Sequence, residues 1–174
     1  GSGTSTSGAF TMNTSNTNSG RWNNSHMRKT VLGSDASPTS PRANTLLAAL
    51  PADLRAVMKP ITKYSDNTGG GNNTASYVTS TTDYLPLLAE FEIHGARTYA
   101  NSAEQNYQQQ YAYYQAGNSK VHYKHNATGT AATAWCRSVR ATNAYNFCRV
   151  YTGGSAIDLN ARWSNGFAPG FKVA

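Results

Sequence analysis

The sequence is short of charged residues, which make up 13% of its 174 positions, and only eight residues are acidic. Solubility must therefore depend on Asn, Ser, Thr, Gln and Gly, a composition common in extracellular and virion proteins. No segment approaches the roughly 20 consecutive apolar residues that a membrane-spanning helix requires, so we expect no membrane insertion. A hydrophobic fraction of 39% is still sufficient for the core of one domain.

Cysteine is also scarce, because Cys136 and Cys148 are the two in the chain. Antiparallel pairing around a turn near Thr142 would place them opposite each other, which permits one disulfide. The alternative is two unbridged thiols that pack as small apolar side chains in a reducing compartment. The four histidines lack the spacing of metal ligands, so the sequence predicts no zinc site, and we expect no cofactor.

Few titratable groups are arranged as a catalytic site requires. Glu90 and Glu92 lie two residues apart in the most apolar passage, 83–93, where a strand would place them on one face. Paired carboxylates occur in glycosidases, but in a chain with so few acids we expect this pair to bind Arg side chains or to fix a loop. The glycine run at 69–71 lacks the Lys-Ser/Thr that follows in a phosphate-binding loop.

The last quarter of the chain, 137–171, contains large side chains one or two at a time among Ser, Asn, Gly and Ala. Small residues leave the backbone accessible, while Tyr, Trp and Arg provide the most contact energy per ordered side chain. The segment contains one carboxylate, Asp158, and no His. This pattern is typical of a recognition surface rather than of a catalytic centre.

The framework between these side chains resembles a known family. It includes W-x-R-S at Trp135–Ser138, N-F-C-x-V at Asn146–Val150 and N-G-F-A-P-G-F at Asn165–Phe171, with R-W-N-N-S-H-M-R at Arg21–Arg28 and L-P-A-D-L-R-A-V at Leu50–Val57 upstream. These motifs are similar to those of the variable proteins that bacterial and phage diversity-generating retroelements diversify. The resemblance implies an α+β, C-type-lectin-like fold of the formylglycine-generating-enzyme type, with short antiparallel sheets, two or three helices and long loops. It also implies ligand binding rather than catalysis.

Such retroelements replace template adenines at random, so an Asn codon can change into codons for many residues while codons without adenine stay constant. The C-terminal quarter has the expected mixture. Phe147, Val150, Gly154 and Ala156 are candidates for the constant framework, whereas Trp163 departs from the scheme because its codon cannot arise from an Asn codon. The residues that adenine changes in an Asn codon can produce are Tyr145, Arg149, Tyr151, Gly153, Ser155, Ile157, Asp158, Leu159 and Asn160.

We therefore predict a rigid scaffold that displays exchangeable contact residues. The expected partner is a protein or glycan on a host or neighbouring cell surface, and the carrier is a phage receptor-binding protein or a displayed adhesin, on the virion or outside the cell. One such site would give about micromolar affinity, or about 8 kcal/mol, and a homo-oligomer such as a trimer would raise the avidity. The predicted contact residues are Arg140, Thr142, Asn143, Tyr145, Arg149, Tyr151, Ser155, Ile157, Asp158, Leu159, Asn160, Arg162 and Trp163.

Two alternatives stay open. The formal charge of +7, with basic and aromatic residues interleaved, also occurs in nucleic-acid-binding domains. The basic residues are spread along the chain, however, and their longest run is Arg28 and Lys29, so we expect no nucleic-acid partner. The formylglycine-generating fold also hosts oxidases, and fold alone does not settle function. A cell-envelope enzyme of that kind would use Cys136 and Cys148 as a reactive pair.

The remaining pattern predicts how the domain is organised. Residues 1–20 alternate Thr, Ser, Asn and Gly and predict a flexible arm before a domain at 21–174. Pro51 should separate two short helices. A longer helix is expected at 102–117, with its three tyrosines at 107, 111 and 114 on one face.

Beneath the recognition surface, four framework residues are expected to point inward. We predict that Trp135 lies in the core and that hydrogen bonds bury Arg137 and thereby hold the loops. Phe147 and Val150 are expected to point into the core and to anchor the segment there. This separation of inward from outward side chains is the central prediction for the C-terminal quarter.

Overall fold

The computed structural model describes residues 10–69, 73–125 and 127–174. Its helices are short, and a π-helical segment at Met27–Leu32 and single 3₁₀ turns at Ala75–Tyr77 and Ser102–Asn106 accompany them. The helices are α1 (Arg21–Asn24), α2 (Leu46–Ala49), α3 (Ala52–Val57), α4 (Glu90–His94) and α5 (Ala112–Gln115). The strands are β1 (Met58–Lys59), β2 (Ile61–Asp66), β3 (Val78–Asp83), β4 (His122–Lys124), β5 (Ala127–Ala132), β6 (Ala134–Val139), β7 (Asn146–Val150), β8 (Ala156–Asn160), β9 (Gly166–Phe167) and β10 (Lys172–Val173).

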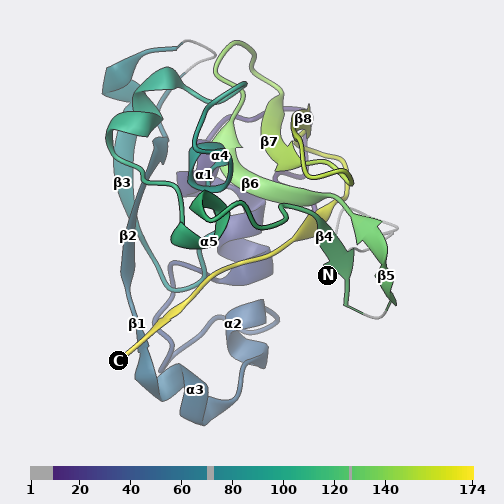
Figure 1. The fold of residues 1–174 in the computed structure, drawn as a ribbon. Coiled ribbons are helices and arrows are strands. Elements are labelled where there is room, and N and C mark those ends of the chain that lie inside the picture. The colour runs from purple at the N-terminus through teal and green to yellow at the C-terminus, as the bar shows by residue number, and fades with distance from the viewer. Residues whose placement is uncertain (1–9, 70–72, 126) are drawn as a thin grey trace.

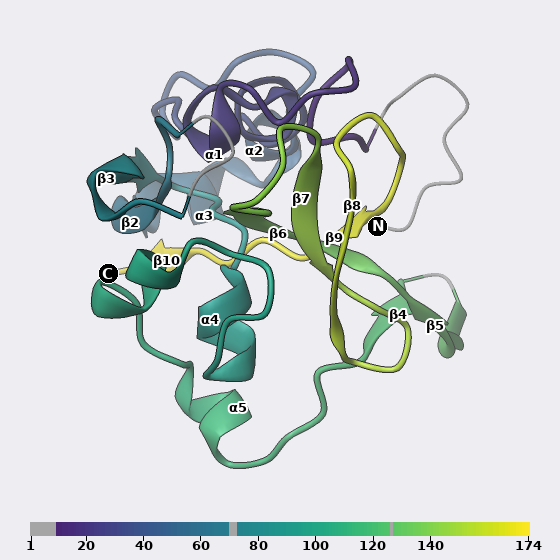
Figure 2. The same ribbon diagram turned by 90° about the horizontal axis from the view of Figure 1, so that it is seen from above.

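Within the described residues, the largest sheet has the order β8-β7-β6-β9, and three two-stranded ribbons pair β1 with β10, β2 with β3, and β4 with β5. All pairs are antiparallel except β6 with β9, which is parallel. The expected mixture of short antiparallel sheets and few helices is confirmed. Figures 1 and 2 show β2 and β3 on one side of the molecule and β7 and β8 on the other, with α4 and α5 between them.

The four-stranded sheet lies between two apolar clusters, so β6 is buried along its whole length. The larger cluster contains Trp22, Trp135 and Phe147, and the smaller one contains Ile93 and Val150. Side chains of a strand point alternately to opposite faces, and a strand buried on both faces therefore cannot show a simple apolar-polar alternation. Trp135, Phe147 and Val150 point inward, as predicted.

The N-terminal segment is part of the domain from residue 10 onward. Met12 is fully buried in the larger cluster, Phe10 packs against it, and the indole N–H of Trp135 donates to the Phe10 carbonyl oxygen at 2.9 Å. The prediction of a flexible arm through residue 20 is therefore wrong for residues 10–20. Complete burial of Met12 alone contributes about 1.5–3 kcal/mol, and the partly buried Phe10 adds to it. Residues 1–9 lie outside the described residues.

The two helices on either side of Pro51 form as predicted. The Thr45 hydroxyl accepts a hydrogen bond from the Ala48 N–H at 3.3 Å and caps α2. Pro51 directly precedes α3, where its missing N–H removes no helical hydrogen bond.

Among the described residues, no helix combines the length and apolar character needed to cross a bilayer.

The helix predicted at 102–117 does not form. The chain makes a 3₁₀ turn at Ser102–Asn106, runs without helical structure to residue 111 and then forms α5. The intervening segment is held by contacts to distant segments instead. The Gln108 side chain donates to the Tyr64 carbonyl oxygen of β2, the Gln110 side chain donates to the Ile93 carbonyl oxygen of α4, and the Tyr111 N–H donates to the Glu92 carbonyl oxygen. The tyrosines at 107, 111 and 114 consequently contact different neighbours instead of one face.

Candidate functional site

The sheet strands β6, β7 and β8 form the scaffold of the C-terminal quarter. Phe147 is paired with Val139 on one side and with Leu159 on the other, and all three contact the larger apolar cluster. Cys148 and Val150 occupy the opposite face, in the smaller cluster. Apolar packing on both faces of β7 therefore holds the backbone of this strand in place.

Arg137 lies at the centre of this scaffold and is fully buried. Its Nε donates to the Ser65 hydroxyl at 2.9 Å, and its two terminal nitrogens donate to both carboxylate oxygens of Glu92. The same nitrogens also donate to the backbone oxygens of Leu87 at 2.8 Å and Tyr64 at 3.2 Å. The prediction that hydrogen bonds bury Arg137 is confirmed, and these bonds join β6 to β2 and α4.

Glu92 also binds a second cation, because the Lys63 ammonium donates to its Oε1 at 2.8 Å. Burial by itself would raise the pKa of the Glu92 carboxyl. The attraction of Arg137 and then of Lys63 outweighs that effect and lowers the pKa of Glu92 from 4.5 to about 2. Glu92 is thus an ionised structural carboxylate, held between two cations.

This arrangement predicts a dependence of stability on pH. The folded-state pKa of Glu92 lies below its ordinary value, so the stabilisation is complete above about pH 4.5 and is lost as the pH falls toward 2, by an amount on the order of 3 kcal/mol. Glu92→Gln should flatten this part of the curve of unfolding free energy against pH, measured by urea denaturation. Asp53→Asn removes an equal charge from an exposed site and should leave the slope unchanged. Equal slopes for wild type and Glu92→Gln would contradict the assignment.

Glu90 has a structural function of a different kind. It lies in α4, not in a strand, and its carboxylate accepts hydrogen bonds from the backbone N–H groups of Tyr99 at 3.0 Å and Ala100 at 2.7 Å. Glu90 therefore fixes a loop, and Glu92 binds an Arg side chain, as the sequence indicated for this pair. Neither carboxylate is free to act in catalysis in this arrangement.

The predicted contact residues all keep some exposure to solvent. Tyr145, Tyr151 and Trp163 are the largest of them, and their exposed fractions of 54%, 46% and 57% are high for aromatic side chains. Thr142, Ser155 and Arg162 are also exposed, and the other seven are partly exposed. The framework neighbours on β7, in contrast, are buried.

One group of contact residues lies where β6, β7 and β8 meet at the turn between β6 and β7. The Arg140 guanidinium donates to the Asp158 carboxylate at 3.0 Å and to the Thr142 hydroxyl at 3.2 Å. The backbone N–H of Ala161 donates to the Tyr145 carbonyl oxygen at 2.9 Å, which joins this turn to the loop after β8. The turn group consists of Arg140, Thr142, Asn143, Tyr145, Asn160, Arg162 and Trp163.

A second group lies at the opposite end of the β7–β8 hairpin. The Arg149 guanidinium is 5.8 Å from the centre of the Tyr151 ring, and the Tyr151 N–H donates to the Ser155 carbonyl oxygen at 2.8 Å. Gly154 adopts a φ of 85° in this turn, a conformation that favours glycine. Tyr145 and Tyr151 flank β7, so the two groups lie about 20 Å apart at 3.3 Å per residue; Figure 2 shows the hairpin between them.

The residues of β8 do not form one outward face. Ile157 pairs with Arg149 and Leu159 pairs with Phe147, whereas Asp158 pairs with Cys148 on the other face of the sheet. Leu159 packs against the larger apolar cluster, and the Asp158 carboxylate accepts hydrogen bonds from Arg140 and Asn146. This corrects the expectation that both are free contacts, since each also supports the scaffold.

Sequence reasoning missed the contribution of the N-terminal segment to the turn group. The Asn18 side chain donates to the carbonyl oxygens of Asn143 and Asn146, both at 3.0 Å. The Asn13 N–H donates to the carbonyl oxygen of Ala161, also at 3.0 Å. The exposed Asn16 is hydrogen-bonded to Asn160. The only signal in the sequence was the pair of apolar residues at 10 and 12.

Comparison with known proteins gives one result. Residues 7–174 match the family described as Domain of unknown function (DUF6273). The chain belongs to the DUF6273 family. Neither the curated proteins nor the solved structures contain a match to the chain. The DUF6273 match includes Phe10 and Met12, which pack in the larger apolar cluster.

The cysteines of this DUF6273 domain are free and buried. Burial raises the pKa of both thiols, and the nearby Glu90 carboxylate raises it further. The alternative of a disulfide is therefore not realised, and a thiol with a raised pKa has little of the thiolate form that reacts. Among the described residues there is also no group of three or more His, Cys, Asp or Glu side chains that could hold a metal ion.

Proposed function

We propose that this DUF6273 domain is a ligand-binding module of the retroelement-diversified, C-type-lectin-like kind, and that it binds a protein or glycan on a cell surface. The site is the recognition surface, which we define as the turn group together with the hairpin-end group of Arg149, Tyr151 and Ser155. Asp158, Ile157 and Leu159 connect the two groups through β8. A phage receptor-binding protein or a displayed adhesin is the carrier that fits this activity.

The observation that carries the proposal is the division between exchangeable and constant side chains. Residues accessible to adenine replacement are exposed or partly exposed, while Phe147, Cys148, Val150 and Ala161 between them are buried. Substitution at the exposed positions would leave the packing of β7 unchanged. A surface that changes its chemistry at constant backbone geometry is suited to selection of new ligands.

The charge and composition of the recognition surface indicate the kind of ligand. It contains three arginines, at 140, 149 and 162, against one acid, Asp158, which already accepts from Arg140. Arg149 and Arg162 stand near Tyr151 and Trp163 in the two groups, and such Arg and aromatic residues dominate binding energy at interfaces. The surface is therefore suited to a ligand with acidic groups, by long-range attraction. Display on a trimer or other homo-oligomer would add avidity.

Retention on bacterial cell envelopes tests the proposal. Purified protein is incubated with envelope preparations from a panel of bacteria, and we expect saturable binding to a subset of them with a dissociation constant of about 1 µM. The nucleic-acid alternative predicts that nuclease treatment removes the binding and that affinity falls steeply with salt. Absence of saturable binding across the panel, or its loss on nuclease treatment, would contradict cell-surface recognition.

The DNA beside the gene provides a separate test of diversification. A retroelement origin predicts a near-copy of the codons for residues 137–171 next to a reverse transcriptase gene, with differences confined to adenine positions. Without such a copy, the surface would be a constant binding site rather than a diversified one.

A further inference from the structure

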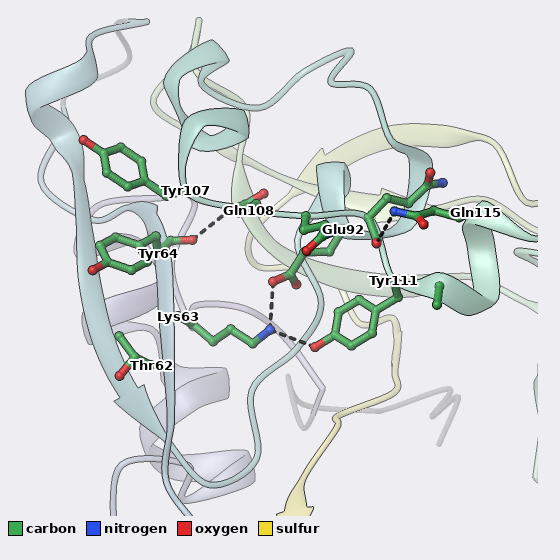
Figure 3. A pocket seen from close by; sticks show the side chains of 11 residues that line it. Thr62, Lys63, Tyr64, Glu92, Tyr107, Gln108, Tyr111 and Gln115 are labelled. Atoms are coloured by element: carbon green, nitrogen blue, oxygen red, sulfur yellow. Dashed lines mark hydrogen bonds and ion pairs between the residues drawn. The ribbon is translucent and has the colours of Figure 1, made fainter.

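Two hollows of ligand size lie beside different parts of the domain. The one next to β2 has a volume of about 420 Å³, and Figure 3 shows the Lys63 ammonium between Glu92 and Tyr111 there. That ammonium donates to Glu92 Oε1 and to the Tyr111 hydroxyl, both at 2.8 Å, so it belongs to the ion cluster that holds the scaffold. The other hollow, which we call the apolar cavity, has a volume of about 790 Å³. Small-ligand sites have volumes of about 300–1,000 Å³.

The lining of the apolar cavity comes from segments that are distant in sequence. Val31 lies in the π-helical segment, Leu46 in α2 and Phe167 in β9, while Phe10 precedes the first helix. These four side chains are partly buried and pack against the larger apolar cluster. The rings of Phe10 and Phe167 meet edge to face, with their centres 5.2 Å apart. The cavity is therefore an opening at which the apolar core of the domain reaches the surface.

Two walls of the cavity are held against each other. In the π-helical segment, Arg28 Nε donates to Asp83 Oδ1 at 2.7 Å. The segment ends at Gly33, whose φ is 68°. A Cβ at Gly33 would lie 2.6 Å from Oγ1 of Thr45, the residue that caps α2. Glycine therefore allows the π-helical wall and the α2 wall to approach closely, and the cavity between them is formed before a ligand enters.

Uncommon backbone conformations occur in both walls. A π-helix is rare and is frequently found at functional sites, and here Thr30 and Val31 of the π-helical segment line the cavity. Asn44, also in the lining, has a φ of 61°. Residues other than glycine seldom adopt this left-handed region, and those that do cluster at active sites and ligand clamps. The presence of both features at one cavity favours a functional site over a packing defect.

The described lining contains no Lys, Arg, Asp or Glu. Burial lowers the pKa of the His26 imidazole in the lining, so the ring is uncharged at neutral pH and offers one N–H donor and one acceptor. The backbone N–H of His26 donates to Asn13 Oδ1 at 3.2 Å, while its ring has no hydrogen bond among the described residues. A charged group inside the cavity would find no opposite charge, and its burial would be unfavourable.

We propose that the apolar cavity binds a small uncharged molecule with an aromatic or short aliphatic body and one hydroxyl group. The chain carries a formal charge of +7, yet no cation lines this cavity among the described residues, so the attraction that suits the recognition surface to acidic ligands does not operate here. The nine residues before Phe10 contain no apolar side chain larger than that of Ala9, so they offer none that would fill the cavity.

This site goes beyond the proposed function. The lining that the structure describes includes none of the predicted contact residues. Exchange of those residues would therefore leave the lining unchanged, and all variants of the recognition surface would share the cavity.

Fluorescence titration with Nile red, an uncharged dye that brightens in apolar surroundings, tests the assignment on wild-type protein. The dye should bind saturably, one molecule per chain, with a dissociation constant of about 10 µM. Naphthol has the predicted chemistry and should displace it. Naphthoate has the same rings with an ionised carboxylate, and it should displace the dye at least about tenfold more weakly.

A pair of tryptophan variants locates the binding. Ala49→Trp adds a large side chain to the lining at the end of α2, where Ala49 is exposed, and should weaken Nile red binding at least about tenfold by occupying the cavity. Ala56→Trp adds the same side chain at an exposed position of α3 outside the lining. This control variant should bind the dye as wild type does.

Backbone amide shifts give a measurement that does not depend on the variants. On addition of naphthol to wild-type protein, the largest changes should fall within residues 26–31 and 44–49. The proposal is overturned by any one of four results: no saturable dye binding, equal displacement by naphthoate, shifts centred elsewhere, or equal effects of the two tryptophan substitutions.

Sedimentation velocity tests a second copy of the chain as the occupant. A dimer that Ala49→Trp dissociates, in protein that binds no dye, would make the cavity an interface between copies and would also overturn the proposal. Each of these results leaves envelope binding by the recognition surface unaffected, so the two hypotheses fail separately.

Discussion

Arg137→Ala should destabilise the protein by about 3–5 kcal/mol, because it removes one partner of a buried ion pair and leaves the other carboxylate without its main counter-charge. The guanidinium makes five hydrogen bonds that join three segments distant in sequence. Lys63 alone cannot replace them, since it contacts one oxygen of Glu92. Urea denaturation monitored by tryptophan fluorescence measures the change in unfolding free energy.

Arg140→Ala is the matched control for this experiment. It removes the same side chain from the adjacent end of β6, where the ion pair to Asp158 involves an Arg side chain that is 38% exposed. Exposed pairs contribute about 0–1 kcal/mol, so the cost should stay below about 1 kcal/mol. If the two variants lose similar stability, the buried cluster does not hold the scaffold in the way described.

Replacing Arg149, Tyr151 and Trp163 together by Ala should weaken binding to cell envelopes by at least about 100-fold, since Arg, Tyr and Trp anchors commonly contribute 2 kcal/mol or more each. Stability should change by no more than about 1 kcal/mol, because such losses come mainly from buried positions. Tyr151 and Trp163 are about half exposed, and Arg149 has a buried Nε without a partner among the described residues. Binding is measured by titration and stability by urea denaturation.

A matched control removes the same number of aromatic rings and cations elsewhere. Tyr113, Phe171 and Lys172 are exposed. Strand β10 pairs with β1 and lies away from β7 and β8 (Figure 2). This triple variant should bind as wild type does. Loss of binding in both triple variants would indicate nonspecific adhesion, and a large loss of stability in the first would show that its residues belong to the core.

The C-terminal quarter illustrates where sequence reasoning succeeded. Trp135, Phe147 and Val150 are buried, and Arg137 is enclosed by hydrogen bonds. These positions could be predicted because a large apolar side chain among small neighbours has few favourable environments other than the core. The same holds for an arginine that can donate two hydrogen bonds to one carboxylate. The exposure of Tyr145 and Tyr151, on either side of β7, was predicted from the same contrast between large side chains and small neighbours.

Other parts of the site could not be predicted from local pattern. The helix expected at 102–117 was inferred from start and stop signals at Ser102 and Gly117, but Gln108 and Gln110 bind carbonyl oxygens of β2 and α4, which are distant in sequence. The N-terminal segment was likewise assigned to a flexible arm from its composition, although Met12 is fully buried. In both cases contacts across the chain outweighed local propensity.

The sequence by itself determined the inward anchors of the C-terminal quarter, because these depend on residue type and spacing. Only the tertiary structure decided that the predicted contacts form two groups at the ends of one hairpin, since strand pairing sets which side chains become neighbours. The tertiary structure also formed a hollow of about 420 Å³ whose lining includes Lys63, Tyr107 and Gln115. Those residues come from separate segments, and no local pattern specifies which of them meet.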